Sequence, residues 1–156
     1  MTMRTLIAGF GNVLLSDDGF GVEVVKRLAG SALPAHVETM DVGIGGMDLV
    51  LRLMEGFEAI IVVDAVSRGE SPGTLYCFAP DAADIHLGAG ERIYPHFAEP
   101  TRSMKLASVL GYLPDNVTVV GCEPASCELG MSLTHAVDTA ADRAVETICK
   151  MVGYAG

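Results

Sequence analysis

Two carboxylates in this chain stand where parallel-sheet proteins place their chemistry. Asp18 follows a Gly-rich turn after the first apolar run, and Asp64 lies near the end of the most apolar run, "AIIVVDAV" (59–66). An ionised group at the end of a buried strand is costly unless it is paired or coordinated, although loop amides can satisfy a structural Asp. Two acids above neighbouring parallel strands would lie close together, which suits either proton sharing or a bound cation.

A histidine could complete such a site from the loop that precedes the fifth apolar run. His96, in "IYPHF" (93–97), is the best candidate, and His86 is the alternative. Two carboxylates and one imidazole leave coordination positions open, and they suit a first-row metal such as nickel, zinc or manganese. A metal site formed by Asp18, Asp64 and His96 is therefore one hypothesis, and a structural role for the two acids is the other.

The glycines at 9–11 resemble the start of a nucleotide-binding turn, but the following residues argue against one. The last glycine of a dinucleotide motif would fall on Leu14, and no Gly-Lys-Ser/Thr follows. Asp17 and Asp18 would also repel a phosphate at this helix start. Ser16 or Asp17 is expected to cap the helix, and for Asp17 this structural role is favoured over a role in the site. There is no Gly-x-Ser-x-Gly elbow, so no serine nucleophile is predicted.

The periodicity of the chain predicts an α/β fold. Apolar runs that predict strands lie at 4–9, 37–41, 59–66, 74–78 and 117–121. Helical patterns lie at 18–29, 48–54, 103–113 and 134–152, and a loop region is expected at 79–100. We expect a three-layer αβα sandwich with a mostly parallel sheet of about five strands, as a single domain over residues 1–156. The run 59–66 should be its central strand.

Charge and composition exclude some classes of partner. The formal net charge is −10, which argues against nucleic acid and anionic membranes, because both attract basic surfaces. No apolar run reaches the roughly 18 residues that a membrane span needs. We expect a cytoplasmic protein without membrane insertion, whose four cysteines are free thiols and several of them buried.

Several segments in order resemble one family of proteins. The segment "GFGNVLLSDDGFGVEVV" (9–25) is similar to the opening signature of the endopeptidases that mature [NiFe]-hydrogenases. The resemblance continues through "DVGIGGMDL" (41–49), "IIVVDAVSRGESPGTL" (60–75), the Pro-His pair at 95–96, "VVGCEPA" (119–125) and "GMSLTHAV" (130–137). It therefore covers nearly the whole chain.

The resemblance implies a function. Such enzymes remove a short C-terminal extension from the hydrogenase large subunit precursor once nickel has been inserted, so the nickel belongs to the substrate. By motif position, the metal-contacting residues of the family fall on Asp18, Asp64 and His96, and the family often has Glu at the first position. Asp41 matches another acid near the site and is secondary. The resemblance implies an aspartyl-type hydrolase that needs no Ser or Cys nucleophile.

One segment departs from the family pattern, and two other functions remain open. The chain after His96 reads "HFAEPTRSMKLASVL" (96–110), and we hypothesise that residues 97–102 help to select the hydrogenase partner. A non-enzymatic nickel-binding maturation or metallochaperone-like protein could use the same three side chains. A nucleotide-binding module of the flavodoxin or Rossmann type is the third hypothesis. Loss of the precursor's C-terminus would distinguish the maturation endopeptidase from these two alternatives.

Overall fold

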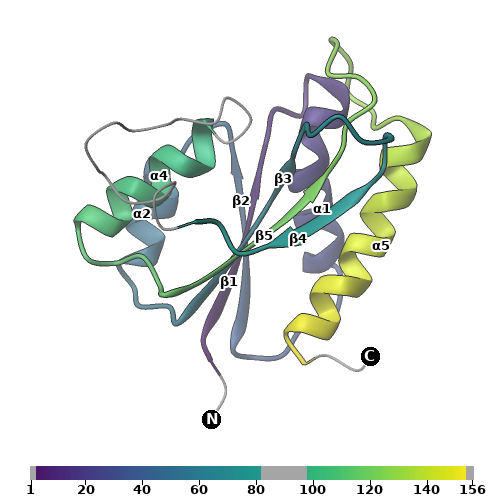
Figure 1. Ribbon diagram of the computed structural model, residues 1–156. Coiled ribbons are helices and arrows are strands. Elements are labelled where there is room, and N and C mark those ends of the chain that lie inside the picture. The colour runs from purple at the N-terminus through teal and green to yellow at the C-terminus, as the bar shows by residue number, and fades with distance from the viewer. Residues whose placement is uncertain (1–2, 82–97, 154–156) are drawn as a thin grey trace.

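The apolar runs of the sequence build the sheet, and the segments between them build helices. The computed structural model describes residues 3–81 and 98–153 (Figure 1). The strands are β1 (Thr5–Phe10), β2 (Val37–Gly43), β3 (Ala59–Ala65), β4 (Leu75–Phe78) and β5 (Asn116–Cys122). The helices are the 3-10 turn η1 (Ser16–Gly19), α1 (Phe20–Ala29), α2 (Met47–Leu53), α4 (Ala98–Val109) and α5 (His135–Met151). The predicted α/β class is confirmed.

The order of the strands creates a topological switch point. The five-stranded sheet has the order β2-β1-β3-β5-β4, with β3 in the centre as predicted. The β4 strand alone runs antiparallel, beside β5. The chain leaves β1 through α1 to β2 on one side, whereas β3 pairs with β1 on its other side. The carboxyl ends of β1 and β3 therefore flank a topological switch point, where open α/β sheets bind ligands.

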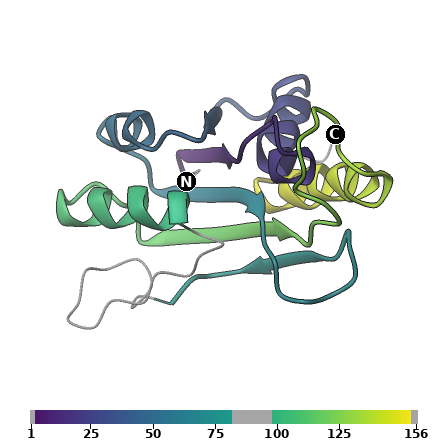
Figure 2. The same cartoon turned by 90° about the horizontal axis from the view of Figure 1, so that it is seen from above.

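Each face of the sheet is covered by two helices. Along β3, Ile60 and Val62 pack with residues of α2 and α4, whereas Ile61 and Val63 pack with residues of α1 and α5. This alternation is the period of two that a strand buried on both faces requires. Figures 1 and 2 show the two helix pairs on opposite sides of the sheet. The predicted three-layer sandwich is confirmed.

Two helix starts differ from the sequence prediction. The predicted helix at 18–29 begins as the separate turn η1, and α1 follows from Gly19 without a side-chain cap, so the expected cap by Ser16 or Asp17 is wrong. The α4 helix begins at Ala98 rather than at residue 103. Pro100 lies in its first turn, where the missing N–H has no helical partner to lose. None of the described helices is long and apolar enough to cross a membrane.

The cysteines are free, as predicted, but most of them are not buried. Cys122, in β5, is the buried one, while Cys77 and Cys127 are exposed and Cys149 is half-buried. The expectation of several buried thiols is therefore wrong. Burial raises the pKa of the Cys122 thiol to about 12, so this residue behaves as a core side chain rather than as a reactive group.

Candidate active site

Glycines allow the turn after β1 to lie directly on the sheet. A Cβ on Gly21 would lie 2.1 Å from the carbonyl oxygen of Val63 and 2.4 Å from that of Phe10, so the first turn of α1 contacts the backbones of β3 and β1. Gly11 has a φ of +129°, and a Cβ there would lie 1.9 Å from the carbonyl oxygen of Asp18. These glycines therefore serve close backbone packing, which holds η1 at the carboxyl edge of the sheet.

Asp18 and Asp64 are each held by a backbone amide. Asp18 is half-buried in η1, and its Oδ2 accepts a hydrogen bond of 2.8 Å from the N–H of Asn12. Asp64 is 6 % exposed, and its Oδ1 accepts a bond of 2.9 Å from the N–H of Ala65. Amide donors stabilise a carboxylate without neutralising its charge. In each case the amide fixes the position of one carboxylate oxygen.

The structure brings both carboxylates to the same edge of the sheet. The η1 turn contacts β3, the strand that carries Asp64. Desolvation and, after it, the negative charges of Asp18, Asp17 and Asp64 raise the pKa of the Cys127 thiol, which lies on the loop after β5. The negative charges of both predicted site carboxylates therefore act on the same thiol.

The third predicted ligand lies outside the residues that the structure describes. This holds for His96 and for the alternative His86. Over residues 3–81 and 98–153, no group of three His, Cys, Asp or Glu side chains is close enough to hold a metal ion. The structure thus supplies the two carboxylates, and the histidine stays a prediction.

Asp17 has a role that the sequence analysis missed. Its side chain is fully buried. The Oδ2 atom accepts bonds from the N–H groups of Ala125 and Ser126 and from the hydroxyl of Thr134, and Oδ1 accepts the N–H of Thr134, all at 2.7–3.1 Å. Asp17 thus holds the loop that leads into α5 instead of capping its own helix. No local pattern could reveal this, since its partners are more than 100 residues away in the chain.

Two loops, which we call the paired loops, meet beside Asp18. They comprise residues 11–16 after β1 and residues 125–134 after β5. An isolated bridge joins Leu15 to Gly130, and the N–H of Ser16 donates to Gly130 O at 2.8 Å. Ser16 has a φ of +52°, which is unfavourable for a residue with a side chain, and its hydroxyl donates to Glu128 O at 2.8 Å. Figures 1 and 2 both show the paired loops side by side.

A second buried carboxylate at this edge has a structural role. Glu123 accepts a bond of 2.6 Å from the hydroxyl of Tyr76 and bonds from the backbone N–H groups of Arg68 and Glu70. Burial by itself would raise the pKa of Glu123, but these hydrogen bonds outweigh it and lower that pKa. Burial and then the bond to Glu123 raise the pKa of Tyr76 to about 12. Glu123 therefore fixes the loop between β3 and β4.

Asp41, the secondary candidate, is exposed near the end of β2. Its neighbours Met40 and Val42 pack against the cluster formed with α2 and α4. Because side chains alternate along a strand, Asp41 lies on the other side of β2. Asp64 comes two residues after Val62, so its side chain lies on the same face of β3, the face that α2 and α4 cover. The structure therefore does not bring Asp41 to the face that Asp64 occupies.

The fold defines a single-sheet α/β protein with two carboxylates at the switch point, and comparisons with known proteins identify the family. The family model described as hydrogenase maturation protease (HycI) matches residues 22–151. The hydrogenase expression/formation protein HupD of Rhodobacter capsulatus is 40 % identical over 144 residues, which are 91 % of this chain and 68 % of that protein. The hydrogenase 2 maturation protease of Escherichia coli is 31 % identical and covers 99 % of this chain and 93 % of its own length.

A solved structure agrees with these sequence comparisons. The hydrogenase maturating endopeptidase HybD of Escherichia coli superposes with a TM-score of 0.82 at 31 % identity, over 99 % of this chain and 94 % of that one. The chain therefore belongs to the hydrogenase maturation protease family. It is a hydrolase, and the predicted resemblance is confirmed.

Proposed function

We propose that this protein removes the C-terminal extension of a [NiFe]-hydrogenase large subunit precursor in the cytoplasm, after nickel has been inserted into that subunit. The observation that carries the proposal is the placement of Asp18 and Asp64 at one edge of the sheet, beside the switch point between β1 and β3. The names of the relatives, a hydrogenase 2 maturation protease and a hydrogenase maturating endopeptidase, support a hydrogenase as the substrate.

In this proposal, Asp18, Asp64 and His96 bind the nickel that the substrate carries. Carboxylate oxygens and an imidazole nitrogen form a donor set that suits a borderline divalent metal. The amides of Asn12 and Ala65 each hold one carboxylate oxygen and so orient the two side chains. Since the nickel comes with the precursor, the protein needs no resident metal, although another divalent ion could compete for the same side chains.

Binding the substrate's nickel would place the scissile bond above the two carboxylates. Positioning of this kind can supply a large part of a rate enhancement. The metal would polarise the scissile carbonyl or activate a water molecule. The carboxylates of Asp18 and Asp64 could take up and return a proton, which would make the enzyme aspartyl-type. The raised pKa of Cys127 keeps its thiol protonated, so it is a poor nucleophile.

The test is the mass of the precursor after incubation with the protein. A purified large subunit precursor is incubated in two forms, nickel-loaded and nickel-free, and mass spectrometry then measures the large subunit. We expect loss of a C-terminal peptide from the loaded form alone. Cleavage of both forms would contradict nickel recognition. An intact precursor together with tight nickel binding by the protein alone would instead favour a nickel-binding maturation protein without protease activity.

A further inference from the structure

The tips of the paired loops expose large apolar side chains beside the site. Leu129 is 87 % exposed and Met131 is 82 % exposed, and they flank Gly130, the residue that pairs with Leu15. Val13 and Leu14, on the facing loop, are also exposed. A single exposed apolar residue needs no explanation, but four on two adjoining tips form a local apolar surface.

These tips are held in place rather than left free. The N–H of Gly130 donates to Leu14 O at 2.9 Å, and the N–H of Asp17 donates to Ser126 O at 3.0 Å. The buried Asp17 carboxylate adds its bonds to Ala125, Ser126 and Thr134. A surface that is already ordered loses little conformational entropy when a partner binds. The chain therefore maintains this apolar surface in a fixed position.

The position of the surface indicates its occupant. Asp18 follows directly from one of the paired loops, and Ser126, on the other, accepts a hydrogen bond of 3.0 Å from the N–H of Asp17, the residue beside Asp18. A polypeptide that brings its cleavage site to these carboxylates would therefore lie beside the tips. With a net charge of −10 and carboxylates at this edge, the protein would repel an acidic segment, so an apolar segment fits best.

We propose that Val13, Leu14, Leu129 and Met131 form a docking surface for an apolar segment of the hydrogenase precursor next to its cleavage site. This inference rests on the proposed function and adds the surface that holds the substrate. Contacts of this kind are equal in the ground state and the transition state, so they govern KM and Kd rather than kcat.

The experiment measures binding and cleavage separately in the full-length protein. The test variant carries Leu129→Ser and Met131→Ser, and the control variant carries Val109→Ser and Leu110→Ser, a second exposed apolar pair at the far end of α4. Titration of the nickel-loaded precursor gives Kd, and mass spectrometry over time gives KM and kcat. We expect Kd and KM to rise about tenfold or more in the test variant, with kcat unchanged, and to stay unchanged in the control.

Three results would contradict the inference. Equal Kd values for the wild type and the test variant would overturn it, and so would equal losses in both variants. A dimer of the wild type that dissociates in the test variant, with Kd unchanged, would show that a second copy covers the surface. A wild type that binds the precursor but does not cleave it would refute the proposed protease function, while the Kd values would still decide the docking surface.

Discussion

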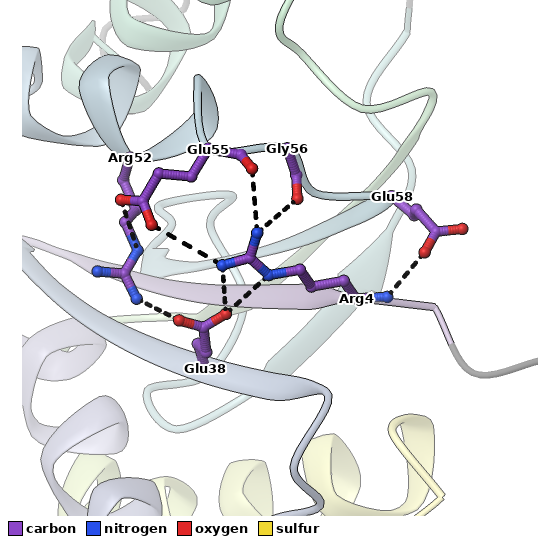
Figure 3. A network of polar contacts seen from close by, with 6 residues as sticks. All are labelled: Arg4, Glu38, Arg52, Glu55, Gly56 and Glu58. Carbon is purple, nitrogen blue, oxygen red and sulfur yellow. Dashed lines mark hydrogen bonds and ion pairs between the residues drawn. The ribbon is translucent and has the colours of Figure 1, made fainter.

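The two ends of the sheet stabilise their carboxylates in opposite ways. At the amino end, Glu38 on β2 accepts bonds from the guanidinium groups of both Arg4 and Arg52, and Glu55 forms further ion pairs with the same arginines (Figure 3). The Arg4 guanidinium also lies 4.2 Å from the ring centre of Phe57. The acidic and basic side chains thus form a network of ion pairs that joins the start of β1, β2 and the end of α2.

At the carboxyl end, Asp17 and Asp18 accept hydrogen bonds from neutral donors. Asp17 takes bonds from backbone amides and a hydroxyl, and Asp18 from the amide of Asn12. Within residues 3–81 and 98–153, no salt bridge reaches either of them. Arginine pairing cancels a charge, whereas amide bonding keeps the charge and fixes its direction. The amino end is thus a network of paired charges, whereas the carboxyl end keeps the negative charge on which the proposed function depends.

The largest expected effect is the loss of cleavage when a site carboxylate is neutralised. Asp64→Asn or Asp18→Asn should reduce precursor cleavage at least about 100-fold, because the amide keeps the shape but removes the charge and the proton acceptor. Cleavage is followed by mass spectrometry, and folding by circular dichroism.

Two variants serve as controls for that result. Asp18→Glu keeps the carboxylate and adds one methylene, so it should retain most of the activity. Asp115→Asn, at an exposed position before β5, should retain all of it. A fully active Asp64→Asn protein would refute the proposed site.

A smaller effect, on stability, should distinguish Asp17 from its neighbour Asp18. Asp17→Ala leaves the amides of Ala125, Ser126 and Thr134 without their acceptor, so it should lower the free energy of unfolding by about 2–4 kcal/mol. Urea unfolding measures this loss. Asp115→Ala is the control and should change stability by less than about 0.5 kcal/mol. Equal stability of the Asp17 and Asp115 variants would contradict the structural role of Asp17.

The smallest effect is expected from a substitution at the amino end of the sheet. Arg4→Ala removes the ion pair with Glu38 and the bonds to the carbonyls of Glu55 and Gly56, and it should cost about 1–2 kcal/mol because the network is partly exposed. Cleavage should stay within about twofold of the wild type. Lys26→Ala, at an exposed position of α1, is the control for the loss of a positive charge. A large loss of cleavage in Arg4→Ala would contradict the view that the amino end of the sheet stabilises the fold without taking part in cleavage.

Much of the fold could be predicted because hydrophobic periodicity is a local property. The run "AIIVVDAV" indicates β3 as the central strand, since a strand covered on both faces is apolar at nearly every position, and Asp64 comes only at its end. The start of α4 is hard to predict because Pro100 favours a loop as well as a first helical turn, and the structure has the helical turn. The turn η1 was missed because acids at a helix start usually indicate caps.

The candidate site was predictable only in part, for a physical reason. The sequence by itself determined which acids follow the apolar runs, and hence that Asp18 and Asp64 lie at the carboxyl ends of strands. Tertiary structure decided which strands are neighbours, and it decided that Asp17 is buried against a loop more than 100 residues away. Hydrogen bonds between distant segments leave no local pattern. The adjacent acids Asp17 and Asp18 therefore look equivalent in the sequence, but the fold makes one a structural anchor and leaves the other facing the site.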